Sequence, residues 1–373
     1  MIQEERMISL FCELCHINAP SLQERDVVEW TKRHLSDAGL EVWEDDAAGK
    51  IGGNSNNLLA RLRGNKPGAP TIFLSAHFDT VEPTEGLEMV EEDGVFRSAS
   101  DTILGADDKA GMAPMIEAVL AAREDGLEHG DIYLLMSCAE EIGLKGAAAM
   151  ELAEYNFDFG FVLDTGPPVG SYVNRTAYHD KLDVRIIGKP AHAGKDPEHG
   201  INAIHVAARA MSEMKIGRIS PNTTSNVGII SGGTGVNVVA PEVTIRCEAR
   251  STVKAELEDQ VRHMILRFED AGSQFGAVVE IDHRRHYDAY VVEENSRVVQ
   301  VGQRASRNLG LEPELRVTLG GSDANMFNKM GIPCIVVATG MKAIHTHDEH
   351  VSRADLMLTT QLCYELIRES ALG

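Results

Sequence analysis

The sequence of 373 residues lacks any apolar run close to the roughly 18–20 residues that a helix needs to span a bilayer. It is also poor in positive charge, with 35 Lys and Arg against 57 Asp and Glu and a formal net charge of −22. Because such a chain repels phosphate backbones and anionic lipids, we expect it to bind neither nucleic acid nor membrane. The N-terminal residues are polar and lack a signal-peptide pattern, so we expect a cytoplasmic protein.

Paired cysteines are scarce as well. The six cysteines are scattered, and most lie in apolar segments, as expected for reduced and buried thiols. Only Cys12 and Cys15 are close in sequence, in a single CxxC with no second pair and no βαβ pattern around it. We interpret them as two thiols on one helix face, with a metal or redox site as the alternative.

The hydrophobic pattern predicts an α/β fold. Apolar runs at 71–76, 131–138 and 159–163 are typical of buried parallel strands, and residues 110–122 form a predicted helix rich in Ala, Met and Leu. The residues at 21–24 match a capping box, which predicts a helix from Ser21 to about residue 39.

The pattern changes near Tyr178. Residues 178–189 alternate polar and apolar, as in a sheet with one open face, and the elements expected up to residue 287 follow the order β-α-β-β-α-β. Strand–helix alternation then resumes. We therefore expect a larger α/β domain formed by residues 1–177 and 288–373, with a ferredoxin-like α+β domain of residues 178–287 inserted into it.

Acidic and imidazole side chains follow several of the predicted strands. His77 and Asp79 end one strand and share a side of it by alternation. Glu140 and Glu141 follow the most apolar strand, and Asp164 follows the next. Two adjacent carboxylates beside a core cost free energy unless a cation or a proton compensates their charge. Since open α/β sheets bind ligands beyond the carboxyl ends of their strands, these residues indicate a site there.

Two further stretches are open to either a structural or a metal-binding interpretation. Asp107 and Asp108 lie in a glycine-bounded loop before a helix, where they can cap that helix. His345, His347 and His350 lie in one loop, which is either a solvated loop or a metal site. Imidazole and carboxylate ligands without thiolate suit Zn²⁺, Co²⁺ or Mn²⁺, and one carboxylate bridging two ions makes a two-metal hydrolase site.

Together, these motifs resemble those of the M20 family of metallopeptidases, and within it the peptidase T-like branch of tripeptide aminopeptidases. The resemblance rests on SAHFDTVEP at 75–83, GADDKAG at 105–111 and PAHAGKDPEHGINAI at 190–204. It implies a zinc-peptidase-like catalytic domain with two divalent metal ions, zinc above cobalt or manganese. It also implies that the inserted domain is a lid through which the protein forms a homodimer.

The resemblance assigns metal-binding roles to five residues: His77, Asp107, Glu141, Asp164 and His345. It places His77 and Asp164 on one ion and Glu141 and His345 on the other, with Asp107 bridging both. It selects His345 within the histidine-rich loop because this residue stands four positions before an acidic residue, at the spacing of the family. It also implies a cis peptide bond directly after Asp107.

Catalytic and substrate-binding roles follow from the same resemblance. Glu140 matches the general base, and Asp79 matches the residue that orients the first histidine ligand. His192 matches a histidine that reaches the partner subunit's active site and helps to stabilise the oxyanion.

Asn237 and Arg250 match substrate contacts from the lid. Arg250 can bind a substrate carboxylate with both arms of its guanidinium, although a surface ion pair with a nearby acid is the alternative. Gly321 and Ser322 match a glycine-rich loop near the substrate, and Ser322 also suits the N-cap of the following helix.

We therefore expect a two-metal aminopeptidase that hydrolyses short peptides of the tripeptide type, with Glu140 activating the water between the metals. An N-acyl-amino-acid deacylase or a carboxypeptidase of the same family would use the same metals and base. A catalytically silent peptide-binding module is the alternative from another class. Such a chain is expected to have lost a ligand or the base, whereas all of them are present here.

Overall fold

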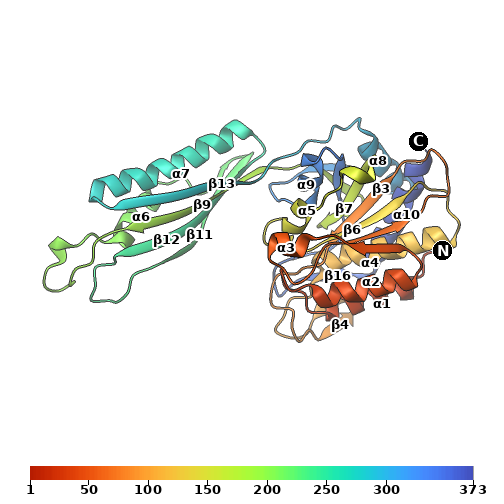
Figure 1. Ribbon diagram of the computed structural model, residues 1–373, viewed down its shortest axis with the longest axis horizontal. Coiled ribbons are helices and arrows are strands. Elements are labelled where there is room, and N and C mark those ends of the chain that lie inside the picture. Colours follow the sequence, from red (N-terminus) through yellow and green to blue (C-terminus); the bar gives the residue numbers. More distant parts are fainter. Residues whose placement is uncertain (373) are drawn as a thin grey trace. The chain divides into compact units, whose positions relative to one another are not determined.

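A computed structural model describes residues 1–372, which form two compact units (Figure 1). The first unit contains Met1–Asn174, Tyr290–Val317 and the chain from Ser322 onward. The second unit contains Arg175–Ala289 together with Thr318–Gly321. None of the helices in the described residues is both long and apolar enough to cross a membrane.

The first unit is built on an eight-stranded sheet with the order β1-β2-β6-β3-β7-β15-β8-β14. Its four inner strands run parallel to one another: β6 (Ile132–Ser137), β3 (Ile72–His77), β7 (Phe159–Thr165) and β15 (Cys334–Ala338). Every residue of β3, β6 and β15 is buried, which is typical of strands covered on both faces. The outer strands are β1 (Glu41–Glu44), β2 (Leu58–Leu62), β8 (Ser171–Arg175) and β14 (Glu314–Val317).

Two groups of helices pack on this sheet. The first group is α1 (Glu4–His16), α4 (Ala106–Glu124), α8 (Arg297–Asn308) and α10 (Arg353–Leu372). The second group is α3 (Ala47–Ile51), α5 (Lys145–Ala149) and α9 (Asp323–Lys329), while α2 (Arg25–Asp37) contacts β1 and β2. Gly111 lets α4 approach β7 closely, because a Cβ atom there would overlap the carbonyl oxygen of Leu163. The expected α/β class is confirmed.

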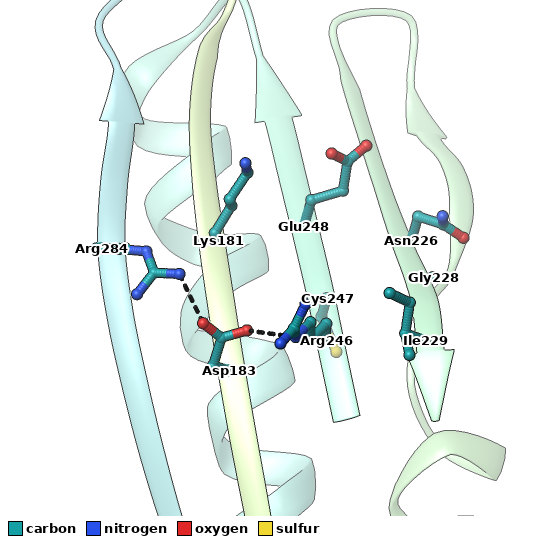
Figure 2. Close-up of a pocket in the computed structure, with 9 residues that line it drawn as sticks. All are labelled: Lys181, Asp183, Asn226, Gly228, Ile229, Arg246, Cys247, Glu248 and Arg284. Carbon is teal, nitrogen blue, oxygen red and sulfur yellow. Dashed lines mark hydrogen bonds and ion pairs between the residues drawn. The ribbon is translucent and has the colours of Figure 1, made fainter. Parts of the chain in front are cut away.

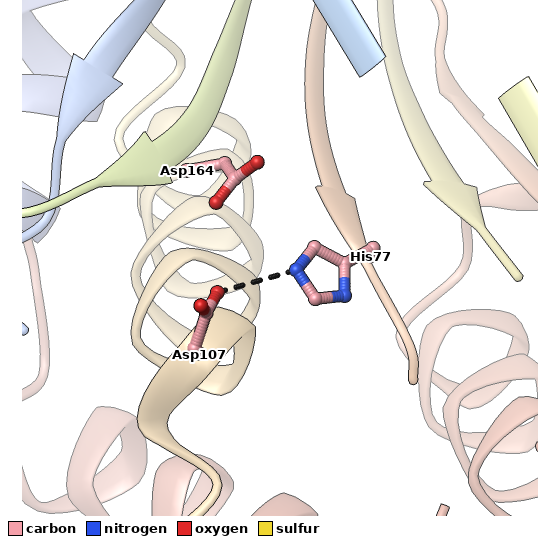
Figure 3. A group of neighbouring side chains, drawn as sticks. All are labelled: His77, Asp107 and Asp164. Carbon is pink, nitrogen blue, oxygen red and sulfur yellow. Dashed lines mark hydrogen bonds and ion pairs between the residues drawn. The ribbon is translucent and has the colours of Figure 1, made fainter. Parts of the chain in front are cut away.

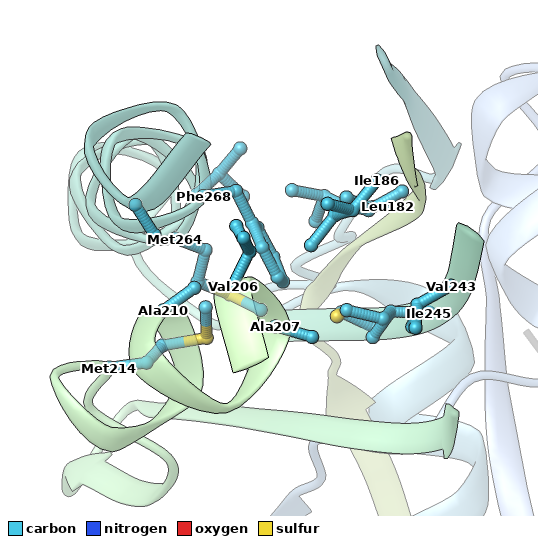
Figure 4. Close-up of a cluster of buried hydrophobic side chains, with 14 of the residues drawn as sticks. Leu182, Ile186, Val206, Ala207, Ala210, Met214, Val243, Ile245, Met264 and Phe268 are labelled. Atoms are coloured by element: carbon cyan, nitrogen blue, oxygen red, sulfur yellow. The ribbon is translucent and has the colours of Figure 1, made fainter. Parts of the chain in front are cut away.

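The second unit is an antiparallel sheet with the strand order β10-β11-β12-β9-β13 and two helices on one face. Its elements are β9 (Tyr178–Ile187), α6 (Ala203–Ser212), β10 (Gly217–Ser220), β11 (Thr223–Gly232), β12 (Glu242–Ser251), α7 (Lys254–Phe275) and β13 (Val278–Tyr287). Leu182, Val206, Ile245, Met264 and Phe268 are among the buried side chains that join the sheet to the helices (Figure 4). Strand β10 is an addition to the predicted β-α-β-β-α-β order.

The other face of this sheet carries several charged side chains. Figure 2 shows a shallow pocket on it, with a volume of about 360 Å³. Asp183 on β9 lies 2.6 Å from a guanidinium nitrogen of Arg284 and 3.7 Å from one of Arg246. Ion pairs of this kind account for the polar half of the alternation that the sequence shows along β9.

The predicted capping box at 21–24 is wrong. Helix α2 begins at Arg25, and Glu24 precedes it without a capping hydrogen bond from its side chain. The hydroxyl of Ser21 donates instead to Oδ2 of Asp79, at 2.6 Å. The side chains of this segment therefore serve tertiary contacts.

A separate three-stranded sheet completes the first unit, formed by β4 (Met89–Glu92), β5 (Val95–Ser98) and β16 (His350–Ser352). Cys12 and Cys15 both lie on α1, and the six cysteines are free thiols.

Candidate metal centre

The carboxyl ends of the parallel strands in the first unit carry the candidate ligands. His77 is the last residue of β3, and Asp164 is the last but one of β7. Glu141 lies in the turn that follows β6, and His345 lies in the segment between β15 and β16. Because parallel strands end at the same edge of a sheet, residues distant in sequence meet there.

One group of side chains contains His77, Asp107 and Asp164, whose ligand atoms all lie within 4.8 Å of one another. Figure 3 shows the three side chains converging from β3, β7 and the start of α4. Nε2 of His77 lies 3.2 Å from Oδ1 of Asp107. His77 and Asp107 are almost completely buried, so water compensates little of their charge.

A second group contains Asp107, Glu141 and His345, again with ligand atoms within 4.8 Å of one another. Nε2 of His345 lies 3.0 Å from Oε1 of Glu141 and 3.2 Å from Oδ2 of Asp107. Asp107 thus belongs to both groups and directs one oxygen toward each histidine. The peptide bond between Asp107 and Asp108 is cis, as the resemblance implied.

The other two histidines of the loop lie outside these groups. Nδ1 of His347 is 3.9 Å from a carboxylate oxygen of the exposed Asp101. Nδ1 of His350 is 2.8 Å from the backbone oxygen of Asp348 in the same loop. Of the three candidates, the structure brings only His345 to the other predicted ligands.

The electrostatics of the two groups fit divalent cations. Burial raises the pKa of Asp164 well above its usual value, and the neighbouring charge of Asp107 adds to this effect. Burial and the charge of Asp164 raise the pKa of Glu140 in the same way. Asp107 behaves differently, because hydrogen bonds from His345 and His77 outweigh its burial and lower its pKa. Buried carboxylates this close together repel one another, and a bound dication relieves that repulsion. The donor set of imidazole and carboxylate suits Zn²⁺, Co²⁺ or Mn²⁺.

Asp79 connects His77 to the turn after β6. Nδ1 of His77 lies 2.8 Å from the backbone oxygen of Asp79 and 3.4 Å from its Oδ1. A proton on Nδ1 that donates to this oxygen leaves Nε2 as the metal-binding atom. The carboxylate of Asp79 also accepts hydrogen bonds from the backbone N–H groups of Glu140 and Glu141, at 2.9 and 3.1 Å.

Glu349, the acidic residue four positions after His345, holds the backbone that carries Asp107, a role that the sequence does not assign to it. Its carboxylate accepts hydrogen bonds from the N–H groups of Gly105, at 2.6 Å, and Asp107, at 3.0 Å. Burial raises the pKa of Glu349 to about 7. The sequence signal is its fixed distance from His345, but the pattern does not show which amides it binds.

The residues that the resemblance assigns to the lid fall mostly in the second unit. His192 and Asn237 lie on two adjacent segments, joined by the hydrogen bond from Ala193 N to Asn237 O at 2.9 Å. Gly321 packs against the ring of Tyr287, where any side chain would overlap the ring. Ser322 belongs to the first unit and is the N-cap residue of α9, as expected.

Arg250 lies in an ion pair within the second unit. Its guanidinium faces the carboxylate of Glu248, with nitrogen–oxygen distances of 3.0 and 3.2 Å. It also donates to the backbone oxygen of Leu319, at 3.3 Å. The ion-pair alternative therefore describes the geometry of this arginine in the structure, while its predicted contact with substrate stays a prediction.

Imidazole and carboxylate ligands gathered at the carboxyl ends of parallel strands are typical of metal-dependent hydrolases. The model of peptidase family M20/M25/M40 matches residues 73–369. The chain belongs to this family and is a metal-dependent peptidase.

Similar proteins support the same assignment. The chain is 38% identical to the uncharacterized protein YqjE of Bacillus subtilis over 100% of both chains. A tripeptidase structure from Staphylococcus aureus is 35% identical, with a TM-score of 0.94 and 100% of both chains covered. An aminopeptidase PepT structure from Bacillus cereus is 36% identical, with a TM-score of 0.88 and 99% of both chains covered. The expected M20 fold and peptidase T-like character are confirmed.

Proposed function

We propose that this protein is an aminopeptidase that removes the N-terminal residue from short peptides, with tripeptides as its substrates. The observation that carries the proposal is the position of Asp107 between two groups of ligands, with Glu140 next to the ligand Glu141. The tripeptidase and the aminopeptidase PepT among the similar structures support the substrate class.

We propose two metal ions, with zinc in preference to cobalt or manganese. His77 and Asp164 would hold one ion and Glu141 and His345 the other, with Asp107 belonging to both groups. When bound, such ions polarise the scissile carbonyl group and lower the pKa of a water molecule. The ligands are supported by the distances in the two groups and by the repulsion among their buried carboxylates.

Glu140 is the proposed general base. It accepts a proton from the attacking water and then delivers this proton to the departing amine. Only 8% of Glu140 is exposed, and its backbone N–H is fixed by Asp79. A buried carboxylate on a fixed backbone suits a proton carrier, because bulk water competes little for its oxygens.

The remaining roles come from the resemblance and stay predictions. They are oxyanion stabilisation by His192 from a partner subunit, substrate contacts by Asn237, Arg250, Gly321 and Ser322, and orientation of His77 by Asp79. A homodimer formed through the second unit and a cytoplasmic location belong to the same proposal.

A mass-spectrometric time course on one tripeptide, its N-acetyl form and its C-amidated form tests the proposal. The protein is loaded in turn with Zn²⁺, Co²⁺ and Mn²⁺. We expect loss of the N-terminal residue from the free peptide only, and no change in the acetylated one. Release of acetate indicates a deacylase instead, and release of the C-terminal residue indicates a carboxypeptidase. No cleavage with any metal overturns the proposed substrate.

A further inference from the structure

The segment between α1 and α2 contacts the turn that carries Glu140. Glu24 is fully buried, and its Oε1 accepts hydrogen bonds from the backbone N–H groups of Leu22, at 2.8 Å, and Ala139, at 2.9 Å. Ala139 immediately precedes Glu140 and has a φ of 54°, a left-handed conformation that is unfavourable for residues with a Cβ atom. A fixed acceptor on its N–H group helps to hold this conformation.

Two buried carboxylates bind three consecutive amides of this turn. Glu24 accepts from the N–H of Ala139, and Asp79 accepts from those of Glu140 and Glu141. Ser21 fixes Asp79 in turn, because its hydroxyl donates to Oδ2 at 2.6 Å. Bonds of this kind, with a charged acceptor, are stronger than those between neutral groups.

A buried ammonium offsets part of the negative charge. Lys109 is 1% exposed, and its Nζ donates to the backbone oxygen of Phe78, between His77 and Asp79. Its charge interacts with those of Asp79 and Glu24. Oε2 of Glu24 has no hydrogen-bond partner in the described part of the chain. Burying this carboxylate therefore costs free energy. The two hydrogen bonds that Oε1 accepts from backbone N–H groups offset part of this cost.

We infer that Glu24 is a positioning residue for hydrolysis. By fixing the N–H of Ala139, it sets the direction in which the turn presents Glu140 to substrate and Glu141 to its metal. The inference rests on the proposed function, since it takes Glu140 as the base. Glu24 itself touches neither Glu140 nor a predicted metal ligand through any hydrogen bond of its side chain.

The test compares E24M, which removes the acceptor at similar length, with E24Q, which keeps an oxygen acceptor. At saturating metal we expect E24M to lower kcat by about 10–100-fold, the usual effect of losing a group that orients a metal ligand. KM changes by less than about threefold, because no contact with substrate is lost. The affinity of E24M for Zn²⁺, measured by competition with a chromogenic chelator, should also be lower than that of the wild-type protein. E24Q restores both quantities to within about threefold of wild type.

Glu117 provides the matched control. It is a fully buried carboxylate on α4 that accepts hydrogen bonds from the backbone N–H of Gln3, at 2.7 Å, and from Arg6, at 3.0 Å. We expect E117M to lower the melting temperature while leaving kcat and zinc affinity unchanged. A similar loss of kcat in E117M means that the effect in E24M is one of general stability, which overturns the inference.

E24D keeps the experiment decisive if E24M does not fold. The shorter side chain retains the charge but withdraws the acceptor from Ala139, so kcat and zinc affinity should fall as in E24M. Wild-type kcat and zinc affinity in folded E24D or E24M overturn the inference. If the wild-type protein cleaves no peptide, the proposed function fails, and zinc affinity alone then decides the role of Glu24.

Discussion

Oδ2 of Asp107 lies 3.2 Å from Nε2 of His345, which is contributed by a segment near the other end of the chain. The second oxygen of the same carboxylate faces His77 at an equal distance. One side chain therefore connects both groups of ligands, and the proposed two-metal centre depends on it more than on any other residue.

The first prediction concerns this bridge. D107N keeps the shape of the side chain but removes its charge, so the two ions lose a shared anionic ligand. We expect the metal content to fall from two ions per chain towards none, with loss of peptide hydrolysis. Elemental mass spectrometry after gel filtration in metal-free buffer measures the number of ions per chain. A D107N protein that retains two ions per chain rules out the bridging role.

The second prediction separates the base from the ligands. E140Q removes the proton acceptor but leaves the ligand set intact, so the metal content should equal that of wild type. We expect kcat to fall by about 10²–10⁴-fold, the range typical of general acid–base catalysis. Stopped assays on one tripeptide, together with metal analysis of the same sample, provide both readings. Wild-type turnover in E140Q excludes Glu140 as the base.

The third prediction distinguishes the histidines of the loop. H345A should lose activity and at least one ion, because Nε2 of His345 faces both Glu141 and Asp107. H347A is the matched control, since its side chain is 59% exposed and lies outside both ligand groups. We expect H347A to keep wild-type kcat and metal content. If H347A loses metal and H345A does not, the ligand assignment in this loop is reversed.

Three of the five predicted ligands can be placed together from the sequence, because each of the three stands where an apolar strand ends. Strand patterns are local, and in a parallel sheet they place His77, Glu141 and Asp164 at one edge without further information. Glu349 is different, because its hydrogen bonds to the amides of Gly105 and Asp107 depend on how the last third of the chain folds back. No periodicity shows such a contact.

Ser21 and Glu24 match the capping-box pattern in sequence, but their side chains do not cap the helix that follows. Their spacing fits a capping box, and a helix does begin nearby, at Arg25. Tertiary partners, however, take both side chains, because Asp79 accepts from Ser21 and Glu24 accepts from Ala139. A buried backbone amide with no other acceptor outweighs a solvated helix end.

The fourth prediction concerns removal of metal. Without cations the buried carboxylates repel one another, so a chelator should lower the melting temperature of the wild-type protein by several degrees. An ion present at 100 times its Kd stabilises the folded state by about 2.7 kcal/mol. Scanning fluorimetry with and without chelator, followed by added Zn²⁺, measures the loss and its recovery. The melting temperature of D107N should not change when chelator is added. If it falls as much as that of the wild-type protein, the stabilising metal is bound elsewhere.

The fifth prediction concerns the pH dependence of the second unit. Oε2 of Glu248 lies 3.0 Å from Nε2 of His179 and 3.0 Å from a guanidinium nitrogen of Arg250. These two partners outweigh the effect of partial burial and lower the pKa of Glu248 from 4.5 to about 2. A carboxyl group whose pKa is lower in the folded state stabilises that state above pH 4.5, and this contribution is lost as the pH falls to about 2. Because the side chain is 34% exposed, solvent screening reduces the contribution to about 1 kcal/mol.

E248Q removes this titration and keeps the shape of the side chain. Hydrogen exchange of the amides in β12 should therefore be faster in E248Q than in wild type at pH 6, once both are corrected for intrinsic rates. The difference should shrink at pH 3, because the unfolded state, in which Glu248 has its ordinary pKa of 4.5, is then mostly protonated and part of the stabilisation is lost. Lys181 also faces Glu248, so K181M serves as the control and should change the exchange far less than E248Q. An equal difference at both pH values shows that the charge of Glu248 does not stabilise this strand.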